Sequence, residues 1–354
     1  MRLRSQSSID RWTTAPYDLR QNYFEVKMPL KKLLKVFSVV ACVLVVVSAA
    51  HAQNKIRASY SSVSGIFTPV WIATDEKLYQ KHGTDADLVY IGGSAVAVSA
   101  LIAGEIDFIY GGADPIIAGI LAGADLTLAG FISNTTPISL WVGANSGINK
   151  VEDLKGKTVA VTRLASSTAY MAKVAFAQAK LEPIKDIPLI GSGGYPESLA
   201  AMQAGKVQGA MLSPPFTYRG EAMGFKRIWN GAGVEYPSFV LATRKTFIRD
   251  SADRAQRAFN AVAEGVHIFR TDRERAMRVM GKYTKIKDRT ILENTYADNK
   301  DVYSPTLRPT ASGIRPILEV LAATNAKAAN AKPEQFIDGT LSRRLEESGV
   351  TKKF

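Results

Sequence analysis

Short clusters of small and polar residues recur in this chain directly after apolar segments that are predicted to be strands. The clusters are Ser64-Gly65-Ile66, Gly92-Gly93-Ser94, Gly112-Ala113-Asp114 and Ser166-Ser167-Thr168, with Tyr195, Pro214 and Phe216 at comparable places. Each stands at or near the predicted start of a helix, whose first turn offers unpaired backbone N–H groups and the positive end of the helix dipole. Such helix starts bind anions without a dedicated cation. The pattern therefore predicts a binding site for a small anionic ligand.

Several of these residues have a second, purely structural interpretation. Ser94, Ser167 and Asp114 are either ligand-binding residues or helix N-caps, and the glycines either admit a ligand or only make tight turns. Arg163 directly follows a predicted strand, so it either contacts the ligand or forms a surface ion pair. A carboxylate at Asp114 would repel an anion but attract a ligand ammonium group.

Two aromatic residues, Trp141 and Phe216, are placed to stack on a ligand ring or to pack in the core or hinge.

The residue pattern gives less support to an enzymatic function than to a binding function. Once a leader is removed, His82 and His267 are the histidines that remain, and there is no Gly-x-Ser-x-Gly elbow or phosphate-binding loop. We expect no catalytic residues, no metal and no cofactor.

One phrase occurs twice, 101 positions apart (205 − 104). Ala100 to Ile109 reads Ala-Leu-Ile-Ala-Gly-Glu-Ile-Asp-Phe-Ile, and Ala201 to Ala210 reads Ala-Met-Gln-Ala-Gly-Lys-Val-Gln-Gly-Ala. Both predict the last turn of a helix, a glycine in the left-handed conformation and a short buried strand. The spacing is too long for a solenoid repeat, so it predicts two similar α/β lobes with a cleft between them.

Helix starts with an oxygen-bearing residue and a proline are predicted at Thr68-Pro69, Asp114-Pro115 and Ser213-Pro214. In a mainly parallel sheet, strand-to-helix turns gather at the carboxyl edge of the strands, where ligands bind. We therefore expect these three helix starts to face one cleft.

The lobe boundaries are predicted from composition and periodicity. We place one boundary near Val142 to Ser146 and a return crossing at Tyr236 to Ala242, which assigns residues 53–142 and 240–354 to the first lobe and 143–239 to the second. Beyond the return crossing, one face of an amphipathic helix carries Ala255, Phe259, Val262, Val266 and Phe269. We expect a monomer.

The N-terminal region has the pattern of an export signal. Residues 28–52 combine three lysines, an apolar run from Val36 to Ala50 and an Ala50-His51-Ala52 cleavage pattern. Residues 1–27 are then an artefact of start-site choice or an unstructured extension. Cys42, the only cysteine, lies inside the apolar run, and we favour cleavage after Ala52 over lipid attachment at this residue.

Charge argues against a nucleic-acid partner. Residues 1–52 carry eight Lys and Arg against three Asp and Glu, so of the total of +13 the remainder keeps +8. Acids interleave with the bases in the densest basic stretch, Arg270 to Arg275, which is typical of a solvated helix face.

The ordered set of segments resembles the substrate-binding proteins of ABC importers of the nitrate/sulfonate/taurine type. The resemblance runs from about Lys55 to the C-terminus and is carried by Gly65-Ile-Phe-Thr-Pro69, Gly92-Gly93-Ser94, the Leu101-to-Phe108 phrase, Gly147 to Val159 and Lys282-Tyr-Thr-Lys-Ile286. It implies a type II periplasmic-binding fold, with two α/β lobes joined by two hinge crossings that close on a small ligand. Gln208 departs from the family, which commonly has an aspartate there, like Asp107.

The same resemblance implies a periplasmic protein that delivers its ligand to a membrane permease and, indirectly, to that permease's ATPase. Sulfonate, nitrate, a taurine-like zwitterion and an aromatic carboxylate stay open as ligands, and so does a neutral thiamine pyrimidine precursor. A biosynthetic enzyme on this fold is a further alternative. The related thiamine-pyrimidine synthases, however, carry a cysteine-rich iron motif that this chain lacks.

Overall fold

The computed structural model describes residues 55–183, 185–323 and 325–354. Asn54 to Phe354 form one compact unit. The expected extension at 1–27, the leader at 28–52 and Cys42 lie outside the described residues. Within the described ranges, no helix combines the length and the apolar character that crossing a membrane requires.

The first lobe is built on a five-stranded sheet with the order β2-β1-β3-β10-β4. Its strands are β1 (Lys55–Tyr60), β2 (Asp85–Tyr90), β3 (Phe108–Gly111), β4 (Leu126–Ser133) and β10 (Phe239–Arg244). Strand β1 runs parallel to β2 and β3, whereas β10 is antiparallel to β3 and β4. A strand from late in the chain thus lies between two early ones.

The second lobe has a five-stranded sheet of the same plan, with the order β7-β6-β8-β5-β9. Its strands are β5 (Ser139–Gly143), β6 (Val159–Val161), β7 (Leu189–Gly191), β8 (Gly209–Leu212) and β9 (Phe225–Asn230). Strand β6 is parallel to β7 and β8, and β5 is antiparallel to β8 and β9. The two lobes predicted from the repeated phrase are therefore present.

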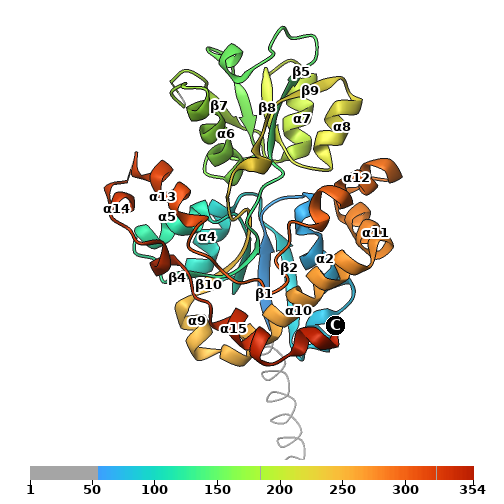
Figure 1. The fold of residues 1–354 in the computed structure, drawn as a ribbon, viewed down its shortest axis with the longest axis vertical. Coiled ribbons are helices and arrows are strands. Elements are labelled where there is room, and N and C mark those ends of the chain that lie inside the picture. Colours follow the sequence, from blue (N-terminus) through green and yellow to red (C-terminus); the bar gives the residue numbers. More distant parts are fainter. Residues whose placement is uncertain (1–54, 184, 324) are drawn as a thin grey trace, which may run out of the picture. The chain divides into compact units, whose positions relative to one another are not determined.

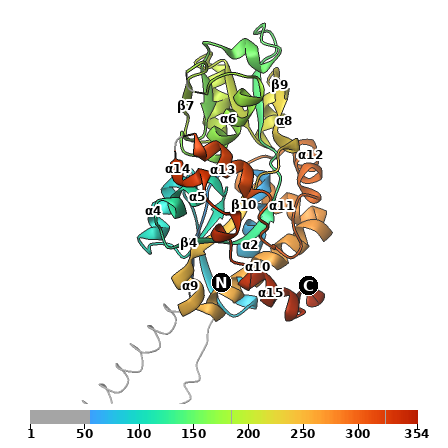
Figure 2. The same ribbon diagram turned by 60° about the vertical axis from the view of Figure 1, so that its left-hand side comes forward.

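Helices surround both sheets (Figures 1 and 2). Three pack on the second sheet: α6 (Ser167–Gln178), α7 (Tyr195–Gln203) and α8 (Phe216–Ala222). The others belong to the first lobe: α2 (Thr68–Asp75), α3 (Leu78–Lys81), α4 (Ser94–Ile102), α5 (Asp114–Leu121), α9 (Lys245–Asp250), α10 (Ala252–Thr271), α11 (Arg273–Thr284), α12 (Arg289–Lys300), α13 (Ile314–Ala322), α14 (Ala326–Ala329) and α15 (Thr340–Glu347).

The long helix α10 confirms the predicted amphipathic face. Ala255, Phe259, Val262, Val266 and Phe269 are all buried in the core of the first lobe. The core that they complete also includes Trp71 of α2 and Phe108 of β3. Burial of this apolar stripe holds the helix on the sheet, since amphipathic helices are stabilised mainly by tertiary packing.

The chain passes between the lobes at residues 134–138 and 231–238, because β4 and β10 lie in the first sheet and β5 and β9 in the second. The boundary expected near Val142 to Ser146 is therefore wrong by one strand. Ser139 to Gly143 pair with β8 and β9, not with the first sheet. An apolar strand of this kind fits either lobe by composition, and only its pairing partners decide.

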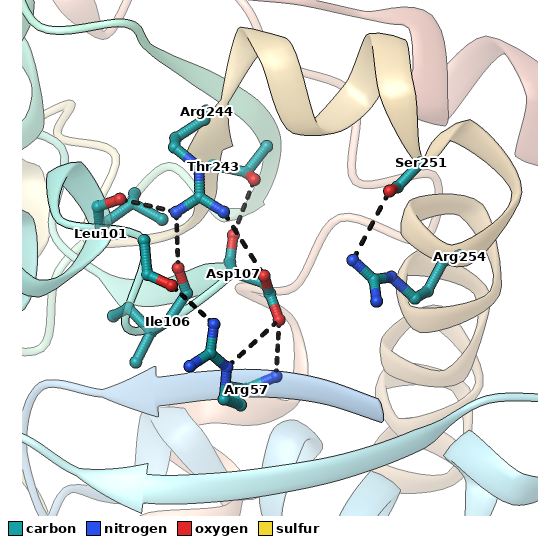
Figure 3. A network of polar contacts seen from close by, with 9 residues as sticks. Arg57, Leu101, Ile106, Asp107, Thr243, Arg244, Ser251 and Arg254 are labelled. Carbon is teal, nitrogen blue, oxygen red and sulfur yellow. Dashed lines mark hydrogen bonds and ion pairs between the residues drawn. The ribbon is translucent and has the colours of Figure 1, made fainter. Parts of the chain in front are cut away.

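The repeated phrase folds as predicted. Helix α4 is followed by Gly104 at φ +76° and then β3, and helix α7 is followed by Gly205 at φ +68° and then β8. In both copies the polar residue before the strand accepts a backbone hydrogen bond, Arg57 N–H to Asp107 Oδ2 at 2.9 Å and Thr158 N–H to Gln208 Oε1 at 3.1 Å. Figure 3 shows the Asp107 copy with its arginine neighbours.

Two of the three predicted helix starts are correct. Helix α2 begins at Thr68 and α5 at Asp114, each with the proline in the first turn. The third is wrong, because Ser213-Pro214 precedes a turn and α8 begins only at Phe216. The Thr68 hydroxyl also does not cap its helix but donates to the carbonyl oxygen of Gly65 at 2.7 Å.

Candidate functional site

A cavity lined mainly by hydroxyl groups lies between the two lobes. Its volume is about 30 Å³, room for about two water molecules. The first lobe contributes Ser61, Ser62, Ser64 and Ser94, and the second contributes Thr162, Ser166, Ser167, Thr168, Tyr195 and Ser213. Among the described residues that line the cavity, none carries a charged side chain. The site can therefore donate several hydrogen bonds without a formal charge.

These residues stand where strands end and helices begin. Ser61 and Ser62 follow β1, Thr162 follows β6 and Ser213 follows β8, so each hydroxyl comes from the carboxyl end of a strand. In α/β sheets this is the edge at which ligands bind. Of the three helix starts expected to face one cleft, Thr68-Pro69 and Asp114-Pro115 do not line the cavity, and Ser213 lines it without beginning a helix.

Helix starts also point at the cavity. Ser94 begins α4, Ser167 begins α6 and Tyr195 begins α7, and all three line the cavity. The N-cap residues are instead Gly93, Ser166 and Gly194, and none of them accepts a side-chain capping bond. The hypothesis that Ser94 and Ser167 are N-caps is therefore wrong, because each is the first residue of its helix. The first-turn N–H groups give this end of each helix a positive potential.

The floor of the cavity is a direct contact between the lobes. Ser64 Oγ and Ser213 Oγ are 2.8 Å apart, and Gly65 N–H donates to the carbonyl oxygen of Pro214 at 2.9 Å. Two other predicted backbone donors also pair within the protein, Gly93 N–H with Ser61 O and Ala113 N–H with Pro237 O. The Ser64–Ser213 and Gly65–Pro214 contacts join the lobes, so a ligand larger than the cavity enters only if these two contacts separate.

Asp114 is buried beside the cavity in a second contact between the lobes. Its Oδ1 accepts hydrogen bonds from the hydroxyl of Tyr236, in the return crossing, and from Ser167 Oγ of α6 at 3.2 Å. Burial raises the pKa of Asp114 to about 6, and the two hydrogen bonds act in the opposite direction. Asp114 is the first residue of α5 rather than its N-cap, which is Ala113.

Gly112 is the residue that allows this cluster to assemble. A Cβ atom at Gly112 would overlap both Ser167 Oγ and the Tyr236 hydroxyl. The position therefore requires glycine for close approach of the second lobe and the crossing, which is the physical reason for one glycine of the predicted set.

Arg163 lies at the rim of the cavity and not in its lining. Its side chain covers the Gly92-Gly93 turn of the first lobe, where a Cβ at Gly93 would come within 2.6 Å of Arg163 Cδ and one at Gly92 within 3.3 Å of Nη2. Arg163 is solvent-exposed. In the described part of the chain no carboxylate forms a salt bridge with it, so the surface ion-pair alternative has no partner there.

The predicted site residues fall into two groups. Those that line the cavity are Ser64, Ile66, Gly93, Ser94, Gly112, Ser166, Ser167 and Tyr195. Those that lie around it are Gly65, Gly92, Ala113, Asp114, Arg163, Pro214 and Phe216. Phe216 is buried and stacks on Tyr195, with ring centroids 6.1 Å apart, and Trp141 is buried with Nε1 donating to Ser139 Oγ. Both aromatics thus pack in the core.

Sequence reasoning missed several lining hydroxyls, Ser61, Ser62, Thr136, Thr162 and Ser238, and named Ser213 only as a helix start. It also missed Tyr236, whose hydroxyl holds Asp114. The available signal was a hydroxyl directly after each predicted strand. Serine and threonine are so common in turns that this signal alone does not separate a lining residue from a turn residue.

Two α/β lobes joined by two crossings, with a polar cavity between them, define the two-lobed periplasmic-binding class. A family model described as "ABC transporter, phosphonate, periplasmic substrate-binding protein" matches residues 70–288. The chain belongs to this family of ABC-transporter substrate-binding proteins, whose members are binding components of transporters and not enzymes.

Known proteins are similar to the chain in sequence or in fold. A binding protein of Brucella abortus (strain 2308) is 25% identical over 245 residues, which cover 67% of this chain and 73% of that protein. The solved periplasmic aliphatic sulphonate-binding protein of Escherichia coli aligns with a TM-score of 0.67 and 21% identity, covering 80% of this chain and 92% of the other. The periplasmic nitrate-binding protein of Synechocystis PCC 6803 aligns with a TM-score of 0.70 and 13% identity, covering 83% and 89%. At these identities the solved structures show a shared fold.

Proposed function

We propose that this protein captures a small anionic ligand of the sulfonate, nitrate, taurine or carboxylate class and delivers it to an ABC-importer permease. The observation that carries the proposal is the uncharged, hydroxyl-lined cavity onto which the starts of α4, α6 and α7 converge. Hydroxyl and backbone N–H donors bind an oxyanion well in a low-dielectric site. Two proteins of the same fold are named as an aliphatic sulphonate-binding protein and a nitrate-binding protein.

A thermal-shift screen of purified residues 53–354 tests the ligand class. Ligands that bind only the native state raise the melting temperature, and the stabilisation grows with the logarithm of the ratio of ligand concentration to Kd. We expect stabilisation by methanesulfonate, nitrate, taurine or acetate, with no change in the added compound after incubation. If none of these stabilises the protein, the anion proposal is wrong.

A neutral aromatic heterocycle, such as a thiamine pyrimidine precursor, is the second candidate. The lack of any charged side chain in the described lining and the presence of Tyr195 favour it specifically. Ionic strength separates the two candidates, because binding of an anion weakens with added salt and binding of a neutral ring does not.

Ligand entry requires the lobes to move apart, because the cavity floor is closed by the Ser64–Ser213 and Gly65–Pro214 contacts. We therefore expect hinge motion about residues 134–138 and 231–238. Small-angle scattering should report a more compact particle when a bound ligand is added to saturation. An unchanged profile would argue for a rigid site.

The proposal includes export to the periplasm, with a leader at residues 28–52 removed after Ala52. The family is periplasmic, and the Lys-rich, apolar and Ala-x-Ala order is typical of a secretory signal. Mass spectrometry of the protein from its native host should find Gln53 at the amino terminus. A retained leader or a lipid on Cys42 would contradict this.

A further inference from the structure

A hydrogen bond between two helices joins the lobes away from the cavity. The hydroxyl of Tyr218 on α8, in the second lobe, donates to Asp298 Oδ2 on α12, in the first lobe, at 2.6 Å. Both views show α8 and α12 side by side where the two lobes meet (Figures 1 and 2). Neither Tyr218 nor Asp298 lines the hydroxyl-lined cavity. The bond therefore connects the lobes without touching the space proposed for the ligand.

The two helices that carry this bond are both anchored at the cavity floor. Pro214, whose carbonyl oxygen accepts from Gly65 N–H, lies two residues before the start of α8. On the other side, Gly65 packs directly on α12, because a Cβ atom there would overlap Thr295 and come within 3.4 Å of Asn299 Nδ2. Helix α8 thus follows one half of the floor contact, and helix α12 supports the other half.

Three contacts between the lobes therefore follow one another along the same two surfaces. The second lobe supplies residues 213–218, and the first lobe supplies the turn at residues 64–65 with α12 packed beneath it. When the two floor contacts separate to admit a ligand, the same movement pulls α8 away from α12. We name these contacts the interlobe seam: Ser64–Ser213, Gly65–Pro214 and Tyr218–Asp298.

The outermost contact of the seam is strong enough to bias the position of the lobes and too weak to lock them. A phenol that donates to a carboxylate forms a charge-assisted hydrogen bond, which is stronger than a neutral one. Solvent reaches this bond, since Asp298 is exposed and Tyr218 is half-buried. We therefore assign it the net worth of an ordinary hydrogen bond, about two- to tenfold in the equilibrium between joined and separated lobes.

From this geometry we infer that Tyr218 and Asp298 form a latch that holds the lobes together and so sets the affinity for the ligand without contacting it. When the binding-competent arrangement is only partly populated, the apparent affinity is reduced by that fraction. Loss of the latch therefore weakens the binding of every ligand by one common factor. Loss of a residue that touches the ligand instead weakens different ligands unequally.

Distances between two spin labels in the ligand-free protein test the latch directly. Residues 53–354 contain no cysteine, so labels can be attached through Ile102→Cys and Gln203→Cys, two exposed and corresponding positions at the ends of α4 and α7. In double electron–electron resonance, Tyr218→Phe and Asp298→Ala should each raise the ratio of separated to joined molecules about two- to tenfold. Asp298→Asn keeps an oxygen acceptor and should resemble the wild type. Asp301→Ala removes another exposed carboxylate, at the end of the same helix, and is the matched control.

The two residues should also act as one unit. The double variant with Tyr218→Phe and Asp298→Ala should shift the populations no further than either change alone, because each change already removes the same bond. The latch is refuted by an unchanged distance distribution in both single variants. It is equally refuted if Asp301→Ala shifts the populations as much as they do.

Titration with methanesulfonate and with nitrate extends the test to binding, and this part rests on the proposed function. Tyr218→Phe should weaken the binding of both anions by the same factor, up to about tenfold. Unequal factors, or no loss for either anion, would overturn the role of the latch in affinity. If neither anion binds the wild type, the anion proposal fails, and the label distances alone decide whether the latch exists.

Discussion

Corresponding helices and strands of the two lobes are offset by a constant number of positions in the sequence, while individual side chains differ both at the site and away from it. Helix α4 (Ser94–Ile102) and helix α7 (Tyr195–Gln203) differ by 101 positions at both ends, as do strands β3 and β8. The same shift relates Asp107 to Gln208 and Arg57 to Thr158, and the same hydrogen bond joins each pair. The scaffold is thus shared, while individual side chains differ.

The Asp107 copy differs from the Gln208 copy in its surroundings. Arg244 approaches Asp107 Oδ1 at 3.4 Å and also donates to the carbonyl oxygens of Leu101 and Ile106, while Arg57 donates to Gly104 O (Figure 3). These carbonyls lie at or just beyond the C-terminal end of α4, where cations are favoured. A carboxylate is required where two guanidinium groups meet, and a neutral amide suffices where only a backbone N–H must be paired.

The largest expected effect tests this difference directly. Asp107→Ala removes the carboxylate that faces the partly buried Arg244 and leaves the Arg57 N–H without its acceptor, so we expect a loss of about 3 kcal/mol in the free energy of unfolding. Asp107→Asn keeps an oxygen acceptor and should lose about 1 kcal/mol. Urea unfolding of both variants measures this. A loss for Asp107→Asn that is close to zero would show that the charge of Asp107 contributes nothing.

The second effect is a pH dependence of stability that arises in the turn after β3 and has no counterpart in the turn after β8. At Ala113-Asp114 the first lobe has a buried acid, whereas the corresponding Pro214-Pro215 of the second lobe has no titratable group. The pKa of Asp114 is raised from 3.8 to about 6, so the folded state holds a proton that the unfolded state releases. Stability should therefore fall as pH rises from about 4 to about 6, by roughly 2–3 kcal/mol, and stay level above that.

Asp114→Asn should remove this pH dependence, because an amide does not titrate. We expect the difference in free energy of unfolding between variant and wild type to move in favour of the variant across this pH window. Unfolding curves at pH 4, 5, 6 and 7 measure the difference, in which the other acids cancel. A difference that does not vary with pH would refute the raised pKa.

The third effect concerns the ends of β1 and β6. Ser62 in the first lobe corresponds to Arg163 in the second, so only the second lobe brings a guanidinium to the rim. Arg163→Ala should weaken binding of methanesulfonate about tenfold, because a charge-assisted hydrogen bond is worth roughly 1.5–3 kcal/mol. The melting temperature without ligand should stay nearly unchanged. Lys206→Ala removes an equal charge elsewhere on the second lobe, and equal binding by both variants would make Arg163 a surface charge only.

The sequence was most informative where local geometry and burial agree. Gly104 and Gly205 had to adopt positive φ to end their helices, and the α10 face had to be buried, so both could be predicted. The first crossing could not, because Ser139 to Gly143 carries no mark of the sheet that it joins. The hydroxyl cavity and the Tyr218–Asp298 bond depend on contacts between the lobes, which no local pattern encodes.

The smallest expected effect is the loss of stability on removing Gln208, the counterpart of Asp107 in the second lobe. Gln208→Ala removes the acceptor of the Thr158 N–H, a bond of 3.1 Å at a half-buried position where water can replace it. We expect a loss of about 1 kcal/mol, clearly below that of Asp107→Ala.

Gln208→Asp supplies the carboxylate that the first lobe uses, but its side chain is shorter. No described arginine is bonded to Gln208 as Arg244 is to Asp107, so the new charge should gain nothing over glutamine. Urea midpoints of the two variants, with Asp107→Ala beside them, decide the matter. If Gln208→Ala costs as much as Asp107→Ala, the backbone hydrogen bond and not the arginine network accounts for the stability of both copies.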